Sequence, residues 1–399
     1  MNTITERILA FNKDRVPTLV KLKYEFMSQD VFRFYRGTCH LFYEDLHKKI
    51  NWEDKTKCWI TGDLHLENFG TYKGDNRVVY FDMNDFDESL LAPSTWELSR
   101  LLTSIHIAAK VLGFSEDLAD KLAADYTNTF INVLKSGKSL VVEKETAEGL
   151  LKQLIKQVQN RSQKEFVLSR VTLEGKKPKL ILNEKILKFK KGADRKKVTD
   201  TFQKWIDNRL GEKKYTILDI AYRIAGTGSV GVRRYVLLLH ETETERMHLA
   251  DLKEAKPSSL MPYSVYEQPI WKSEAERVVT LQKRVEHVSP AFLHPLIVGR
   301  TPFVAKELQP SQDRMDLALC KGKKGKLSGI LCTMADTNAS GQLRSSGRQG
   351  SSTADELINF ATNYKTWKDK VLAYSKQYAK QVVKDYTEYK VDYDAGLIK

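Results

Sequence analysis

The spacing of hydrophobic positions along the chain switches several times between a helical and a strand-like period. Residues 1–50 carry apolar side chains three and four positions apart, which is typical of amphipathic helices. Residues 57–90 contain short β-type runs around a polar turn at 73–76, which predicts a hairpin. The helical pattern returns from Pro93 to about Ser136.

The second half of the chain repeats this alternation on a larger scale. Residues 140–210 are mostly helical in pattern, and residues 215–255 are predicted to form strands. A helix is predicted at 272–287, and two more strand-like segments follow before Ser311. The rest of the chain is helical in pattern, apart from a Ser/Gly-rich stretch at 339–352 that predicts a mobile loop.

This order of elements predicts an α+β fold in which a small β-rich lobe is inserted into a larger helical lobe. We assign the helical lobe to residues 1–214, the β-rich lobe to 215–310, and the completion of the helical lobe to 311–399. A chain of 399 residues is long enough for two such lobes.

The charge balance narrows the possible partners only slightly. Lys and Arg number 65 and Asp and Glu number 51, which gives a net charge of +14. This excess fits a nucleic acid, an acidic membrane surface or an anionic nucleotide. The lysines are spread widely and no nucleic-acid readout motif is present, so we favour solvated lysines and expect no specific nucleic-acid partner. The densest run, Lys185–Lys197, is predicted to be an exposed loop or helix end.

The cysteines and the apolar segments favour a cytoplasmic protein. The four cysteines are scattered without a CxxC pair, so neither a zinc site nor a disulfide framework is expected. No stretch of 18 apolar residues could span a membrane, and the first residues lack the apolar segment of a secretory signal. The sequence leaves the oligomeric state open.

The stretch TGDLHLENFG at residues 61–70 places polar side chains at the end of an apolar strand. If the hairpin folds about Asp75, Asn68 lies opposite Asp82, and both could bind one hard cation such as Mg²⁺. Turn and cap residues are the alternative interpretation. Two polar clusters matched across one hairpin favour a metal or phosphate site.

Further acidic residues lie next to these candidate ligands. Asp63 is placed to accept a proton from a hydroxyl presented near the metal. Asp85 is a third candidate metal ligand, and Asp87 follows it closely. Carboxylates this close repel one another unless a cation or an arginine lies among them.

A glycine-rich segment supplies a candidate nucleotide site. Its G-x-G-x-x-G pattern precedes a β-type run at 234–239, which favours a phosphate-covering hairpin over the strand–turn–helix of a dinucleotide site. The candidate nucleotide-binding residues are Gly226, Thr227, Gly228, Ser229 and Gly231.

Lys253 lies on the next predicted strand. An inward lysine there could hold the α- and β-phosphates of a nucleotide, whereas an outward one would be an ordinary edge lysine. A carboxylate of the helix at 272–287 could orient the lysine, with Glu276 as the first choice and Glu274 as the second.

Together these motifs resemble a protein kinase whose parts occur in permuted order. Asp63 and Asn68 resemble the catalytic-loop pair, in a form close to that of aminoglycoside phosphotransferases, and Asp82 resembles the metal-binding aspartate. Over roughly residues 30–310 the chain resembles the bacterial family called domain of unknown function 2252. The segments that carry this resemblance are FRFYRGTCHLFYEDL, GDLHLENFG, VVYFDMNDFDESLLAPSTWELSRL, GTGSVGVRRYVLLL and DLKEAKPS.

The resemblance implies a circularly permuted, protein-kinase-like two-lobe fold with ATP and Mg²⁺ as cofactors. It implies a phosphotransferase with Asp63 as base and Lys253 on the nucleotide, acting on an unidentified small-molecule or protein hydroxyl. A nucleotide-binding pseudokinase that regulates a partner, and an enzyme that transfers AMP, are the alternatives. Thr61 replaces a histidine common in phosphotransferases, and CTMADTNASGQ replaces an Ala/Arg/His-rich segment frequent in the family.

Several neighbouring residues are expected to support the site. His65 is expected to hold its loop through a hydrogen bond, and Arg36 could reach a phosphate or form a structural ion pair. Trp96 and Glu97 are expected to anchor the following helix, with Glu97 as a buried brace.

Overall fold

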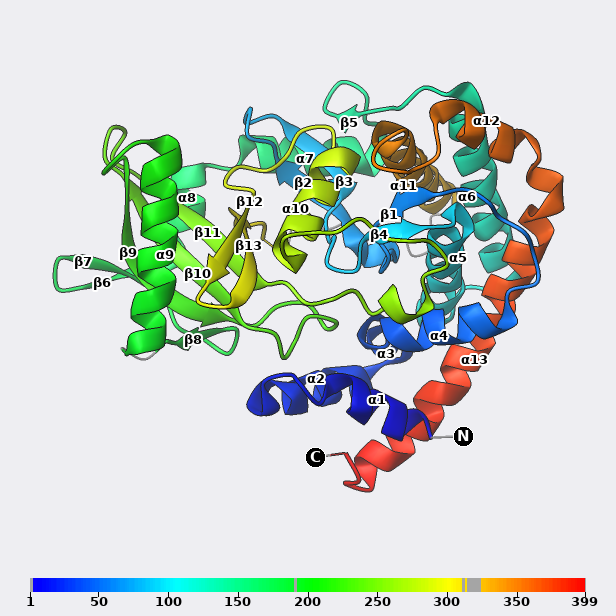
Figure 1. Ribbon diagram of the computed structural model, residues 1–399, viewed down its shortest axis with the longest axis horizontal. Coiled ribbons are helices and arrows are strands. Elements are labelled where there is room, and N and C mark those ends of the chain that lie inside the picture. Colours follow the sequence, from blue (N-terminus) through cyan, green and yellow to red (C-terminus); the bar gives the residue numbers. More distant parts are fainter. Residues whose placement is uncertain (1–2, 190–191, 311–312, 314–323, 399) are drawn as a thin grey trace.

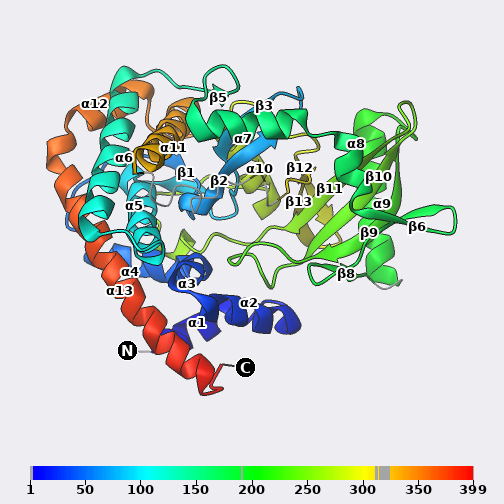
Figure 2. The same ribbon diagram turned by 180° about the vertical axis from the view of Figure 1, so that it is seen from behind.

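A mainly helical lobe and a β-rich lobe make up the computed structural model, which describes residues 3–189, 192–310, 313 and 324–398 (Figures 1 and 2). Helices and several sheets occur together, which confirms the predicted α+β class. Within the described residues, no helix is long and apolar enough to cross a membrane. Three cysteines there are free thiols, and Cys320 lies outside the described residues.

The helical lobe is built from both ends of the chain. Its helices are α1 (Ile4–Asn12), α2 (Pro17–Gln29), α3 (Val31–Gly37), α4 (Cys39–Lys49), α5 (Ser94–Val111), α6 (Glu116–Ser136), α7 (Gly149–Asn160), α11 (Lys324–Ser345), α12 (Ala354–Thr362) and α13 (Lys368–Asp394). Helix α5 is almost entirely buried because α6 and α13 pack against it. One continuous hydrophobic core joins these helices, and α1 lies beside α13 (Figure 1).

Two small sheets carry the polar loops of the helical lobe. Strand β1 (Cys58–Ile60) pairs with β4 (Leu90–Ala92). Strands β2 (Phe69–Lys73) and β3 (Val79–Met83) form the predicted hairpin, to which β5 (Val142–Glu143) adds a third strand. A single 3-10 turn, Leu66–Asn68, leads into β2.

The β-rich lobe is centred on an antiparallel six-stranded sheet of order β12-β13-β11-β10-β9-β8. Its strands are β8 (Ile186–Lys188), β9 (Tyr215–Arg223), β10 (Arg234–Glu241), β11 (Arg246–Glu254), β12 (His294–Val298) and β13 (Thr301–Glu307). Along β10, alternate apolar side chains belong to two different core clusters, one on each face of the sheet. Burial of both faces explains the uninterrupted apolar run VLLL.

The β-rich lobe begins earlier in the chain than residue 215. Helix α9 (Ala193–Leu210) covers one face of the sheet, and α8 (Gln163–Leu168) with the hairpin β6 (Val171–Glu174) and β7 (Lys177–Leu180) contacts the other (Figures 1 and 2). The predicted boundary at 214/215 is therefore too late. The predicted helix at 272–287 is confirmed as α10 (Glu274–Val285), which packs between the sheet and α11.

The Ser/Gly-rich stretch at 339–352 is helical over its first half, because α11 continues to Ser345. The prediction of a mobile loop fails there because the small residues allow close packing. A Cβ at Gly341 would lie 2.7 Å from Cε of Met83 and 2.8 Å from Cγ1 of Val285. Ser340 is also buried, and its hydroxyl accepts the backbone N–H of Leu140.

Gly341→Ala should therefore lower the free energy of unfolding by about 1–3 kcal/mol, because the added methyl group overpacks the contact of α11 with β3 and α10. Gly329→Ala is the matched control, since nothing lies near its Cβ direction in the same helix. Helix propensity should make this control more stable by about 0.5–1 kcal/mol. Chemical denaturation of both variants measures the contrast, and equal effects would contradict the close packing at Gly341.

Candidate functional site

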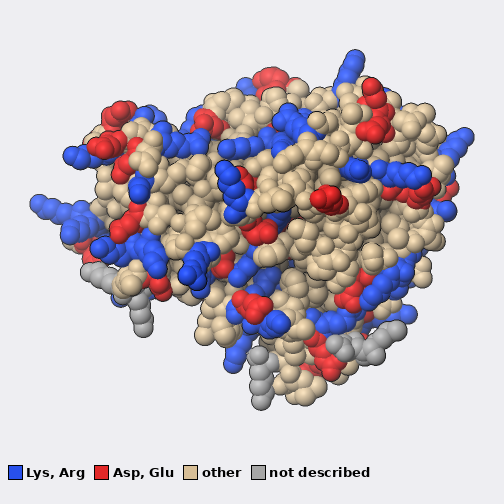
Figure 3. Space-filling model, viewed as in Figure 1, with Lys and Arg blue, Asp and Glu red and all other residues tan. Residues whose placement is uncertain are grey.

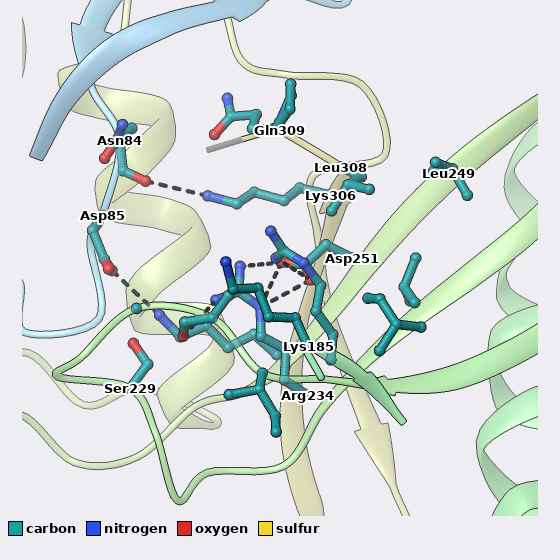
Figure 4. A pocket seen from close by; sticks show the side chains of 18 of the residues that line it. Asn84, Asp85, Lys185, Ser229, Arg234, Leu249, Asp251, Lys306, Leu308 and Gln309 are labelled. Atoms are coloured by element: carbon teal, nitrogen blue, oxygen red, sulfur yellow. Dashed lines mark hydrogen bonds and ion pairs between the residues drawn. The ribbon is translucent and has the colours of Figure 1, made fainter. Parts of the chain in front are cut away.

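A cavity of about 860 Å³ lies between one face of the six-stranded sheet and the segment that follows β3 (Figure 4). Leu249 and Leu308 make one end of its wall apolar, and Arg234 and Lys253 make the other end charged. The charged end is closed by Asp85 and by the glycine loop between β9 and β10. The cavity thus offers an apolar wall and a polar wall to a single ligand.

Lys253 is 7% exposed and faces this cavity from β11. Its Nζ lies 3.5 Å from Oδ1 of Asp85 and also forms an ion pair with Asp87. The lysine is therefore inward, and the interpretation as an edge lysine is wrong. Its carboxylate partners come from the loop after β3.

The predicted partners of Lys253 on α10 serve that helix instead. The carboxylate of Glu276 accepts the backbone N–H of Lys272 at 2.6 Å, and Glu274 pairs with Arg277 at 2.6 Å. Ser273 is the N-cap, so both glutamates lie in the first turn, where carboxylates stabilise the helix N-terminus. The assignment of Glu276 to Lys253 is therefore corrected.

The two carboxylates at Lys253 titrate differently. Burial would raise the pKa of Asp85, but the charges of Lys253 and Lys306 outweigh it and lower that pKa to about 2. Burial and the neighbouring Asp85 raise the pKa of Asp87 against the attraction of Lys253. Asp85 is therefore the carboxylate that stays ionised over the whole physiological pH range.

Asp63 lies on the loop between β1 and β2, and its side chain remains 18% exposed. Its Oδ1 accepts the Nε–H of the fully buried Arg100 at 2.8 Å, and its carbonyl accepts the side-chain amide of Asn68 at 2.6 Å. Burial raises the pKa of Asp63 to about 6, although Arg100 opposes the shift. A Cβ at Gly228 would lie only 3.7 Å from Oδ2, so the glycine loop reaches this carboxylate.

The hairpin register differs from the predicted one. Asp82 lies opposite Gly70, and the carbonyl of Asn68 accepts the N–H of Asn84 at 3.1 Å. The turn causes the difference, because it is centred on Asn76 and not on Asp75: the N–H of Arg77 donates to the carbonyl of Gly74 at 2.8 Å, and Arg77 itself is left-handed (φ 66°). The predicted pairing of Asn68 with Asp82 is wrong for this reason.

Asp82 does not line the cavity. Its Oδ2 accepts Nη2 of Arg344 at 2.8 Å, and burial raises its pKa to about 6. The buried Glu286 lies near the same cluster, and burial followed by the charge of Asp82 raises its pKa further. Of the three predicted metal ligands, Asn68 and Asp85 therefore line the cavities around Asp63 and Lys253, whereas Asp82 is held in a structural ion pair.

The predicted glycine loop is a hairpin connection between β9 and β10, as its β-type continuation indicated. Gly226 and Gly231 have φ values of 74° and 98°, which a residue with a side chain rarely adopts. Gly226, Thr227 and Ser229 line the large cavity, and Gly228 faces Asp63.

The supporting residues lie as predicted. Glu97 is buried and accepts both the backbone N–H and the hydroxyl of Thr61, at 2.6 and 2.5 Å. Arg36 forms an ion pair with Glu67, and Nδ1 of His65 accepts the N–H of Glu67 at 3.2 Å. Thr61 thus binds a buried carboxylate.

Sequence reasoning missed three residues of the site. Arg100 and Arg344 come from helices far along the chain, and nothing in the local pattern marks them. Lys306 donates to the carbonyl of Asn84 at 3.3 Å and lies opposite Asp251 of β11 (Figure 4). Period-2 alternation along β11 and β13 could have placed Lys306 on the face of Lys253.

The basic excess of the chain is dispersed on the face shown in Figure 3, where Lys and Arg alternate with Asp and Glu. In the run Lys185–Lys197, the described lysines are exposed and residues 190 and 191 lie outside the described residues. Among the residues that the structure describes, no group of three or more His, Cys, Asp or Glu side chains is arranged to hold a metal ion.

The sequence model of the family "Uncharacterized protein conserved in bacteria (DUF2252)" matches residues 15–392. The chain belongs to this family. The match extends beyond residues 30–310, over which the motifs resemble DUF2252, and includes α2 and most of α13. No curated protein and no solved structure matches the chain.

Removing the partner of Asp82 tests its structural role in this DUF2252 protein. Arg344→Met should lower the free energy of unfolding by about 3–5 kcal/mol, because it leaves Asp82 buried without its cation. Arg348→Met, at an exposed position just after α11, should change it by less than about 0.5 kcal/mol. Denaturant titration checks both values, and equal stabilities would contradict the ion pair.

Proposed function

We propose that this DUF2252 protein is an ATP- and Mg²⁺-dependent phosphotransferase with a circularly permuted, kinase-like fold. It would transfer the γ-phosphoryl group of ATP to a hydroxyl group. One observation carries the proposal: a single cavity collects a glycine hairpin, a buried lysine and ionised carboxylates that lie far apart in the sequence. Kinases hold a nucleoside triphosphate with the same kinds of group.

The cavity supports a nucleotide by its size and by its polarity. About 860 Å³ is within the usual range for small-molecule sites. The apolar end at Leu249 and Leu308 fits a base (Figure 4). The charged end at Lys253 fits phosphates. In the glycine loop, Gly226 has no side chain that would keep phosphates away, and Thr227 and Ser229 bring hydroxyl groups to the cavity.

Asn68 and Asp85 are the residues that would hold Mg²⁺. The side-chain NH₂ group of Asn68 donates to the carbonyl of Asp63. The side-chain oxygen of Asn68 therefore remains available to a cation. Asp85 is ionised and already lies beside a positive charge, that of Lys253. A bound magnesium ion would supply charge neutralisation at the phosphates.

Asp63 would act as the base. As the acceptor oxygen forms its bond to the γ-phosphorus, the bond from that phosphorus to the bridging oxygen breaks and ADP leaves. The acceptor proton passes to the carboxylate of Asp63, which Arg100 holds in place. Catalysis would come from positioning and charge neutralisation, as in phosphoryl transfer generally.

Asp63→Asn should reduce ATP consumption at least about a hundredfold, because the amide cannot accept the proton. ATP affinity should change less than about threefold, since Asp63 does not line the large cavity. Turnover is followed as ADP release, and affinity by calorimetric titration with Mg-ATP.

Asp75→Asn, in the exposed turn after β2, is the matched control and should keep full activity. A fully active Asp63→Asn enzyme would reject this base. Binding of ATP without consumption by the unaltered protein would favour the pseudokinase, and a gain in mass by one AMP unit on the acceptor would favour AMP transfer.

The pH profile should report the same carboxylate. The pKa of Asp63 lies above its ordinary value, at about 6, so the residue is protonated and inactive as a base below that pH. Consequently kcat/KM for ATP should fall about tenfold per pH unit as the pH drops below about 6. A profile that stays flat between about pH 5 and 7 would exclude Asp63 as the titrating base.

A further inference from the structure

Two cations beside Asp63 have no role in the reaction described above. Lys23 of α2 is 1% exposed, and Arg15 lies half-buried between α1 and α2. Both line a second cavity of about 60 Å³ that also contains Asp63 and Gly228. Neither lines the larger cavity that fits the nucleotide.

The partners of these two cations are all neutral. Nη1 of Arg15 donates to the carbonyls of Gly228 and Val230 at 2.7 and 2.8 Å. Nζ of Lys23 donates to Oδ1 of Asn12 at 3.1 Å and reaches the carbonyl of Gly228 only at 3.4 Å. In the described part of the chain, no carboxylate lies within ion-pair distance of Lys23 or Arg15.

The carboxylates that share this cavity are already engaged. Asp63 is bound by Arg100, Asp85 and Asp87 by Lys253, Glu254 by Lys256, and Glu88 by Ser258 and Ser259. The small cavity therefore contains two basic groups that no neighbouring carboxylate directly neutralises, and burial followed by the charge of Arg15 lowers the pKa of Lys23 well below its usual value.

Burial of such charge is costly unless a partner is bound. The ring of Phe11 lies 5.5 Å from Arg15 and 5.7 Å from Lys23, which compensates only part of the lost hydration. Burial and then the charges of Lys23 and Arg15 lower the pKa of the neighbouring His40 well below its usual value. The local field is thus positive, and an anion would be attracted into it.

We propose that Lys23 and Arg15 form an anion subsite that takes a carboxylate or phosphate group of the acceptor. The acceptor is then a small hydroxylated molecule that carries an acidic group close to its reacting hydroxyl. This inference rests on the proposed function, because Asp63 defines the acceptor side. A cavity of about 60 Å³ has room for one such group.

Inorganic phosphate is the probe for this subsite. Calorimetric titration of phosphate, alone and with saturating Mg-ADP, should show at least about tenfold weaker binding for Lys23→Met than for the unaltered protein. Lys21→Met, exposed on the same helix, should change it less than about twofold. Lys185→Met, at an exposed lysine that lines only the larger cavity, should keep this phosphate site, which separates it from the nucleotide cavity.

Removal of an uncompensated buried charge should also leave the melting temperature of ligand-free Lys23→Met unchanged or higher. A large drop would contradict the absence of a charged partner for Lys23. Unaltered phosphate affinity in Lys23→Met would overturn the subsite. Lys23→Met could instead bind ATP more weakly while its phosphate affinity in the presence of Mg-ADP stays unchanged. That result would assign Lys23 and Arg15 to the γ-phosphate of ATP and overturn their assignment to the acceptor.

The two proposals fail separately. Lys23-dependent phosphate binding in a protein that binds no ATP would support the anion subsite and reject the phosphotransferase. ATP consumption without Lys23-dependent phosphate binding would reject the subsite alone.

Discussion

The ion pairs of Lys253 with Asp85 and Asp87 join the two lobes where the cavity lies. The lysine comes from the sheet of the β-rich lobe, and the carboxylates come from the loop after β3 in the helical lobe. Each partner would be costly to bury alone. The contact links the loop after β3 to the sheet at the cavity, and the charge of Lys253 is the main attraction that lowers the pKa of Asp85.

Local sequence patterns predicted the helices, strands and turns better than they predicted which side chains contact one another. The hairpin, the glycine loop and α10 follow from period, turn residues and spacing, whereas the sequence left the direction of the Lys253 side chain open. The partner of Lys253 did not follow, because helix capping and phosphate-site support both call for a glutamate at the start of α10. Position in the chain could not decide between these uses of Glu276.

Long-range contacts account for most of what sequence reasoning missed. Arg100 and Arg344 determine the roles of Asp63 and Asp82, yet each lies in a helix whose pattern shows only packing. The lobe boundary was placed too late for a similar reason, since β8 and α9 join the sheet only through tertiary pairing. The buried lysine of α2 resembled an ordinary helix lysine until its surroundings were known.

The turn between β2 and β3 limits which insertions and deletions such a site can accept during evolution. Surface loops usually tolerate insertions and deletions, but a one-residue slip in a strand exchanges the sides on which its residues point. In this hairpin, such a slip would move Asp82 away from Arg344 and alter the position from which Asp85 departs. The turn that contains the left-handed Arg77 sets this register, so the length of this exposed turn should be as constrained as the carboxylates themselves.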